Sequence, residues 1–194
     1  MSPRTKEQFE SIRANRKSHI LEVSLEVFAN KGYHQSAISQ IAKEAGISKG
    51  LIYNYFENKE QLLMEVLEDG IRHLLKIFFA KNEQLDANYL KELIQKSFNL
   101  MEEDEIHWRL YFSVVMQADV MMLFMPKFYE IAMPVFENLS AVFSAMGFEE
   151  PMNEARVFGA ILDGLGMNYL MDPENFPKEY CIKRLCDLYN LNKK

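Results

Sequence analysis

Residues 41–56 constrain the fold most, because they read as two short helices joined across a glycine. The apolar residues have helical spacing, and Gly46 interrupts them two positions before Ser48, a typical helix N-cap. Helices this short bury too little surface to be stable alone. They must lock onto a third helix, and residues 8–31 supply one, with an apolar stripe that stops at Gly32.

The rest of the chain shows the same helical periodicity, and no run alternates like a β-strand. The expected N-caps are Ser36, Ser48, Asn58 and Asp86. Further helices are predicted over residues 37–45, 49–55, from 59, 86–103, 104–117, 121–146 (interrupted by Pro126 and Pro134), 153–171 and 177–191. The chain is predicted to be all-α with about nine helices. A three-helix domain is expected over residues 1–60 and a helical C-terminal domain over residues 61–194.

Several protein classes are excluded. No stretch approaches the roughly 18 to 20 uninterrupted apolar residues of a membrane helix, and the N-terminus is polar, so a cytoplasmic protein is expected. Cys181 and Cys186 have the spacing of neither a CxxC pair nor a disulfide framework, and we expect both to be reduced and packed. The histidines lack metal-ligand spacing and no GxSxG, Walker, HExxH or GxGxxG motif occurs. We therefore expect no enzyme, no metal and no cofactor.

Charge is distributed unevenly along the chain. The formal net charge is −6, yet residues 1–60 carry nine Lys or Arg against seven Asp or Glu. Five of those basic residues precede residue 18: Arg4, Lys6, Arg13, Arg16 and Lys17. This asymmetry indicates a polyanion-binding end on an acidic body. The basic segment is either an arm along the polyanion or a solvated helix end.

The segment from 41 to 56 has an apolar and a polar side. Its predicted inner residues are Ile41, Ala42, Ile47, Ile52 and Phe56, and its predicted outer residues are Lys49, Gly50, Leu51, Tyr53, Asn54 and Tyr55. The outer set suits a helix inserted in a major groove of DNA. A Ser48 N-cap would leave the first amides of that helix pointing at phosphates. The alternative is a small three-helix bundle with exposed tyrosines and no nucleic-acid role.

From Lys17 to Leu67 the chain resembles the N-terminal domain of TetR-family repressors. The matching residues are Ile20-Leu21, Phe28, Gly32-Tyr33, Ile41-Ala42, Ala45 to Gly50, Ile52-Tyr53, Tyr55-Phe56, Lys59-Glu60 and Leu62. So many residues at the correct spacing make a specific signal. The resemblance implies a DNA-binding transcriptional repressor.

The resemblance also implies a role for each matching residue of the predicted interface. Lys49, Gly50 and Leu51 would meet base edges, and Tyr53 and Tyr55 would press against the sugar-phosphate backbone. Lys59, together with the first amides of the fourth helix, would bind a phosphate.

This sequence departs from the family pattern at Ala37, where many relatives have a hydroxyl residue. Either that phosphate contact is absent, or Ser36 or Ser39 supplies it. Asn54 either contacts a base or faces solvent.

The C-terminal part is rich in methionine and phenylalanine, with 11 of 12 Met and 11 of 14 Phe beyond residue 60. Such residues pack an irregular core or line an adaptable cavity. Because TetR-like proteins bind small effectors here, we predict an apolar or aromatic effector that releases the protein from DNA by moving the fourth helix. The candidate lining residues are Trp108, Tyr111, Phe112, Met116, Met121, Phe124, Phe128 and Phe158. A DNA-binding protein without an effector is the alternative.

The last two helices carry the predicted dimer contacts. Glycines in a helix make sense where another helix approaches closely, and Asp163 in an apolar stretch needs a partner, either structural or a ligand cation. The family resemblance indicates a four-helix interface between two copies. The predicted contact residues are Gly159, Asp163, Gly166, Tyr180, Leu185 and Leu188. A homodimer would read a palindromic operator of double-stranded DNA.

Overall fold

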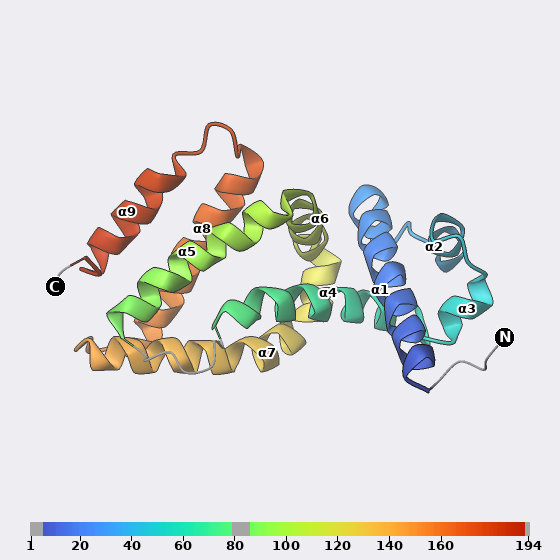
Figure 1. Cartoon of the computed structure of the whole chain (residues 1–194), viewed down its shortest axis with the longest axis horizontal. Coiled ribbons are helices and arrows are strands. Elements are labelled where there is room, and N and C mark those ends of the chain that lie inside the picture. The colour runs from blue at the N-terminus through green and yellow to red at the C-terminus, as the bar shows by residue number, and fades with distance from the viewer. Residues whose placement is uncertain (1–5, 79–85, 193–194) are drawn as a thin grey trace. The chain divides into compact units, whose positions relative to one another are not determined.

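The computed structural model describes residues 6–78 and 86–192, so Arg4 of the basic segment lies outside the described residues. Within these ranges all regular structure is helical, which confirms the predicted all-α class. The α-helices are α1 (Lys6–Lys31), α2 (Ile38–Glu44), α3 (Lys49–Tyr53), α4 (Lys59–Leu75), α5 (Ala87–Glu103), α6 (Glu105–Val115), α7 (Ala118–Ala145), α8 (Pro151–Met171) and α9 (Lys178–Leu188), with a 3₁₀ turn η1 (Lys76–Phe78) after α4 (Figure 1).

The chain divides into two compact units whose boundaries lie inside helices. The N-terminal unit comprises residues up to Gly70 together with Leu110–Phe124, and the C-terminal unit comprises Ile71–Arg109 and Met125–Lys194. The predicted domain boundary at residue 60 lies inside the N-terminal unit and stays a prediction. Two polar contacts explain why residues 110–124 belong with the N-terminal unit: Tyr111 reaches α4 and Gln117 reaches the end of α1.

In the N-terminal unit, α1, α2 and α3 surround a small apolar core. Four of the five predicted inner residues are buried there, namely Ile41, Ala42, Ile52 and Phe56, whereas Ile47 is half-buried. Ile20 and Phe28 of α1 are fully buried as well. The first helix therefore provides the support that the two short helices require.

The end of α4 in this unit is fixed by an aromatic contact. The Tyr111 hydroxyl of α6 donates to the Leu67 carbonyl over 3.1 Å. Its ring lies so close to Gly70 that a side chain there would overlap the ring. Burial raises the pKa of the Tyr111 phenol far above its usual range. Glycine at position 70 is thus required by the close approach of α6.

The C-terminal unit contains two aromatic clusters. Phe143, Phe148, Phe158 and Tyr189 join α7, α8 and α9, with ring centroids 5.2 to 6.2 Å apart. Phe98, Tyr169 and Phe176 form the second cluster, where α5 lies beside α8 (Figure 1). Five of these seven rings are buried, whereas Phe148 and Phe176 are half-buried.

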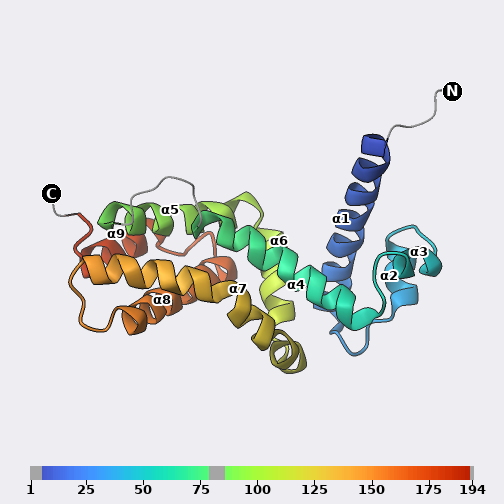
Figure 2. The same cartoon turned by 90° about the horizontal axis from the view of Figure 1, so that it is seen from below.

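Helix α7 continues through two prolines. Pro126 and Pro134 lie inside Ala118–Ala145, although the sequence suggested that they interrupt the helix. Figure 2 shows the helix as α7. Each proline lacks the amide hydrogen that would bond to the carbonyl four residues earlier. Val135, Leu139 and Val142 of the same helix are buried, so apolar packing holds α7 in addition to its backbone hydrogen bonds.

Candidate nucleic-acid interface

A tight turn joins α2 to α3 in the N-terminal unit (Figures 1 and 2). Gly46 has a φ of +66°, a left-handed conformation that favours glycine. The Ile47 amide donates to the Ala42 carbonyl over 2.9 Å and closes the turn. Nε2 of His19 in α1 lies 3.3 Å from the Ala45 carbonyl, which ties the turn to the supporting helix. The crossing of α2 and α3 is therefore fixed locally.

Helix α3 presents one buried residue and an exposed polar face. The Ser48 hydroxyl accepts a hydrogen bond from the Leu51 amide at 3.2 Å, which confirms the predicted N-cap. Ile52 points into the core. Of the predicted outer residues, Lys49, Gly50, Tyr53 and Asn54 are exposed, and Leu51 and Tyr55 are half-buried. A lysine, a glycine, a tyrosine and an amide on one accessible short helix suit contact with DNA bases and phosphates.

Part of the basic segment supports this helix instead of extending from the fold. Residues from Lys6 onward already form α1. The Arg13 guanidinium lies 4.9 Å from the centre of the Tyr55 ring, and Lys17 pairs with Glu65 of α4. The described part of the segment is thus a helix end, and Arg13 holds Tyr55, a contact that sequence spacing did not reveal.

Ser36 and Ser39 are the two residues predicted to supply the phosphate contact that Ala37 cannot make. Their environments in the structure differ. Ser36 is buried, and its hydroxyl donates to the Gly32 carbonyl at 2.7 Å, so it neither caps α2 nor reaches a phosphate. The prediction for Ser36 was wrong because the N-cap of α2 is Ala37, which has no capping side chain. Ser39 is exposed on α2 and keeps its predicted role as a proposal.

The side chain of Lys59 makes hydrogen bonds to the protein's own backbone. Its ammonium donates to the carbonyls of Tyr33, His34 and Ser36 at 2.8, 3.3 and 3.0 Å, and it lies 4.3 Å from the centre of the Tyr33 ring. Desolvation lowers its pKa below the usual lysine value. With its three donors occupied, the ammonium fixes the loop between α1 and α2, and a phosphate contact would have to replace one of these bonds. The other predicted cap, Asn58, does accept from the Gln61 amide at 2.8 Å.

The predicted effector residues fall into both units. Tyr111, Phe112, Met116, Met121 and Phe124 belong to the N-terminal unit, and Trp108, Phe128 and Phe158 to the C-terminal unit. Several of them already have structural contacts, among them Tyr111 at Gly70, Trp108 through its indole nitrogen to the Leu100 carbonyl at 2.9 Å, and Phe158 in the larger aromatic cluster. Met116 and Met121 are exposed. Their role in binding an effector remains a prediction.

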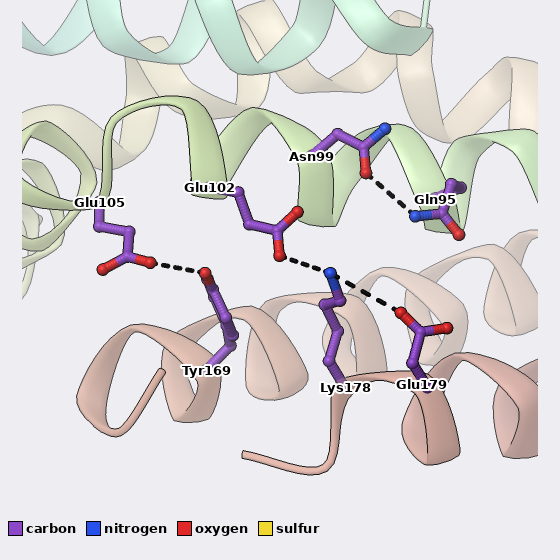
Figure 3. Close-up of polar contacts among 7 residues, drawn as sticks. All are labelled: Gln95, Asn99, Glu102, Glu105, Tyr169, Lys178 and Glu179. Atoms are coloured by element: carbon purple, nitrogen blue, oxygen red, sulfur yellow. Dashed lines mark hydrogen bonds and ion pairs between the residues drawn. The ribbon is translucent and has the colours of Figure 1, made fainter. Parts of the chain in front are cut away.

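The C-terminal unit has an open hollow elsewhere, of about 410 Å³. It lies where α8 and α9 connect, and its lining comprises Glu102, Tyr169, Pro173, Phe176, Pro177, Lys178, Glu179 and Tyr180. Figure 3 shows Lys178 between Glu102 and Glu179, and the Tyr169 hydroxyl donates to Glu105 over 2.7 Å. The hydrogen bond to Glu102 raises the pKa of Lys178. None of the predicted effector residues lines this hollow.

The predicted dimer residues divide into buried and accessible ones. Leu185 and Gly166 pack inside the chain, and a side chain at Gly166 would overlap the end of Met101 from α5. The close approach predicted at Gly166 is therefore made within one chain, and Gly159 similarly faces Phe136 of α7. Tyr180 and Leu188 are exposed, as is Asp163. Although Asp163 is accessible, the dense surrounding protein raises the pKa of its carboxyl to about 6.

Two features are absent from residues 6–78 and 86–192. No helix among them is long and apolar enough to cross a membrane. In the same part of the chain, no group of three or more His, Cys, Asp or Glu is arranged to hold a metal ion.

The geometry of α2, the turn and α3 defines a helix-turn-helix protein. Residues 20–66 match the sequence profile of the tetR family of bacterial regulatory proteins. Over these residues the chain is therefore similar to bacterial regulatory proteins of the tetR family.

The curated proteins with similar sequences are named as regulators too. The fatty acid metabolism regulator protein of Bacillus subtilis is 36% identical over 87 residues, which are 44% of this chain and 45% of that protein. The chain spans less than half the length of the first curated relatives that it matches.

Solved structures share the fold across most of the chain. FadR from Bacillus subtilis in complex with stearoyl-CoA has a TM-score of 0.66 and 23% identity, covering 89% of this chain and 96% of that one. NalD, the secondary repressor of the MexAB-OprM multidrug efflux pump in Pseudomonas aeruginosa, has a TM-score of 0.70 and 20% identity, covering 91% and 96%. Identities this low establish the fold alone.

Proposed function

We propose that this chain is a transcriptional repressor that binds a palindromic DNA operator as a homodimer. The observation that carries the proposal is the exposed face of α3, where Lys49, Gly50, Tyr53 and Asn54 stand on a capped helix held by Ile52 in the core. The first amides of a capped helix and a nearby lysine favour phosphate, while side chains on this face reach base edges.

The operator is to be selected from random double-stranded DNA with the purified protein, and its affinity measured across a salt series. Tyr53→Ala and Lys49→Ala are each expected to weaken binding about tenfold, and Lys49→Ala is also expected to reduce the salt dependence. Tyr129→Ala and Lys183→Ala are matched controls, because both residues are exposed and lie in the C-terminal unit. If all four variants bind alike, α3 is not the reading helix.

A small apolar or aromatic effector is proposed to release the protein from its operator. The support is the methionine- and phenylalanine-rich body and the stearoyl-CoA complex of a protein with the same fold. An effector acts only through its different affinity for the two states of the protein. Stearoyl-CoA, free fatty acids and aromatic cations are to be screened by thermal shift, and each hit tested for its effect on operator affinity at fixed salt.

The competing proposal is a DNA-binding dimer without an effector. It is favoured by the internal contacts of Trp108, Tyr111 and Phe158, which give three of the candidate residues a packing role. A screen without thermal-shift hits, together with unchanged operator affinity, would support it.

A further inference from the structure

We infer that Gln117, between α6 and α7, is a positioning residue for DNA recognition, because its side-chain amide fixes the end of α1 and the loop that leads into α2. The inference rests on the proposed function and adds a residue that lies outside the helix-turn-helix. It concerns the N-terminal unit alone, to which Gln117 belongs.

The bridge replaces a hydrogen bond that is common at helix ends. Gly32, with a φ of +79°, terminates α1, and its amide donates to the Phe28 carbonyl over 3.0 Å. In a Schellman motif the next amide, here that of Tyr33, would donate to the same carbonyl. Instead, Oε1 of Gln117 accepts from the Tyr33 amide at 2.8 Å, and Nε2 of Gln117 donates to the Phe28 carbonyl at 3.1 Å. The glutamine amide thus stands between the two groups and satisfies both.

Few side chains can make this bridge. It requires one donor and one acceptor on a single planar group, at the reach of two methylenes from Cα. Glutamate lacks the donor, asparagine is one methylene shorter, and methionine offers neither group. Tyr33 is buried, so an amide left without its acceptor there is costly.

The same loop is held from its other side by α4. The Lys59 ammonium donates to the carbonyls of Tyr33, His34 and Ser36. Gln117, in contrast, accepts from the Tyr33 amide. Nε2 of His34 lies 2.7 Å from Oδ2 of Asp119, two residues beyond Gln117. Because the loop runs directly into α2, and α2 packs on α3, fixing the loop fixes the direction of the recognition helix.

Residues 110–124 also contact α4, which makes them a brace for the whole unit. Tyr111 bonds to Leu67 in α4 at one end of this segment, and Gln117 bonds to α1 further along. The two supports of the helix-turn-helix, α1 and α4, are therefore connected through one short segment. Without the glutamine bridge, the segment keeps the Tyr111 bond to α4 and the contact of Asp119 with the His34 side chain, but it loses its bonds to the backbone at the end of α1.

The test compares Gln117→Met and Gln117→Asn in the full chain with Gln95→Met as control. Gln95 is an exposed glutamine of α5 whose side-chain amide donates to Asn99 in the same helix, at 3.0 Å (Figure 3). Amide hydrogen exchange of residues 33–53 and affinity for the selected operator are measured in each variant. We expect both Gln117 variants to speed exchange of the Tyr33 amide and of the α2 and α3 amides about tenfold, and to weaken operator binding about fivefold. Gln95→Met is expected to change neither.

Two results would overturn the inference: wild-type exchange across α2 and α3 in both variants, or wild-type operator affinity despite a freed Tyr33 amide. If the wild-type protein selects no DNA, the proposed function fails by itself. The exchange of α2 and α3 then still decides whether Gln117 positions the helices, since an effect confined to Tyr33 would contradict it.

Discussion

Two connections of equal length in the fold are fixed in opposite ways. Residues 32–37 join α1 to α2, and residues 172–177 join α8 to α9. The first is held by side chains from distant parts of the chain, Lys59 and Gln117, which bond to its backbone. The second contains Pro173 and Pro177 and is held by contacts between side chains: the Phe176 ring packs on Phe98 and Tyr169, and Lys178, which follows it, pairs with Glu102 (Figure 3).

The difference extends to close helix contacts in the two units. Gly70 faces the ring of Tyr111, whose hydroxyl is fixed by a hydrogen bond, whereas Gly166 faces the flexible end of Met101. A rigid ring cannot move aside, but a methionine adopts other rotamers at little cost. At these two glycines, the N-terminal unit therefore has a rigid helix contact and the C-terminal unit an adaptable one.

Alanine at the two helical glycines should give the largest contrast. Gly70→Ala forces the Tyr111 ring away from α4, and we expect a loss of roughly 3 kcal/mol in the free energy of unfolding. Gly166→Ala displaces only the end of Met101 and gains helix propensity, so its net change should stay within about 1 kcal/mol. Urea unfolding of both variants is the measurement. Equal losses would contradict the difference in rigidity.

The same substitution at the two lysines compares the connections directly. Lys59→Met removes a charged donor from three backbone carbonyls, and we expect a loss of about 2 kcal/mol. Lys178→Met breaks partly exposed ion pairs and should cost less than about 1 kcal/mol. Only the Lys178 effect should shrink further at high salt, because exposed ion pairs are screened. Urea unfolding at low and at high salt measures both effects, and a larger loss at Lys178 would reverse the comparison.

Proline substitution tests whether the second connection depends on chain stiffness. Pro173→Ala and Pro177→Ala should each lower the free energy of unfolding by roughly 0.5 kcal/mol, because alanine leaves the unfolded chain more freedom. Thermal unfolding, with Pro3→Ala as a control outside the described residues, measures the effect. A loss of several kcal/mol would indicate specific contacts of the prolines instead.

Asp163 should add a small pH dependence to the C-terminal unit. Its folded pKa of about 6 lies above the ordinary value of 3.8, so folding favours the protonated carboxyl. The favourable contribution is complete below pH 3.8 and is lost as the pH rises to 6. Relative to Asp163→Asn, the wild-type protein should therefore become less stable between these two pH values and then level off. Urea unfolding at several pH values would show parallel curves if the carboxyl had an ordinary pKa.

The sequence correctly predicted the helix caps, which depend on residues close together in the chain. The caps at Ser48, Asn58 and Asp86 are confirmed, because each acts within three residues of its own position. The family resemblance likewise located α3 and its exposed face.

Contacts between distant residues could not be read from the sequence. Tyr33 and Gln117 are 84 positions apart, and Lys59 lies 26 positions from Tyr33. Serine is a typical N-cap residue, but the Ser36 hydroxyl points inward and donates to the Gly32 carbonyl. No spacing rule covers such loops, because their path is set by the packing of other helices.

The course of α7 has a consequence for its mechanical stiffness. The boundary between the two units falls between Phe124 and Met125, directly before Pro126. Proline has already removed the hydrogen bond that the Met122 carbonyl would otherwise receive from position 126. Bending α7 at Pro126 therefore breaks one backbone hydrogen bond fewer than bending a helix that contains no proline.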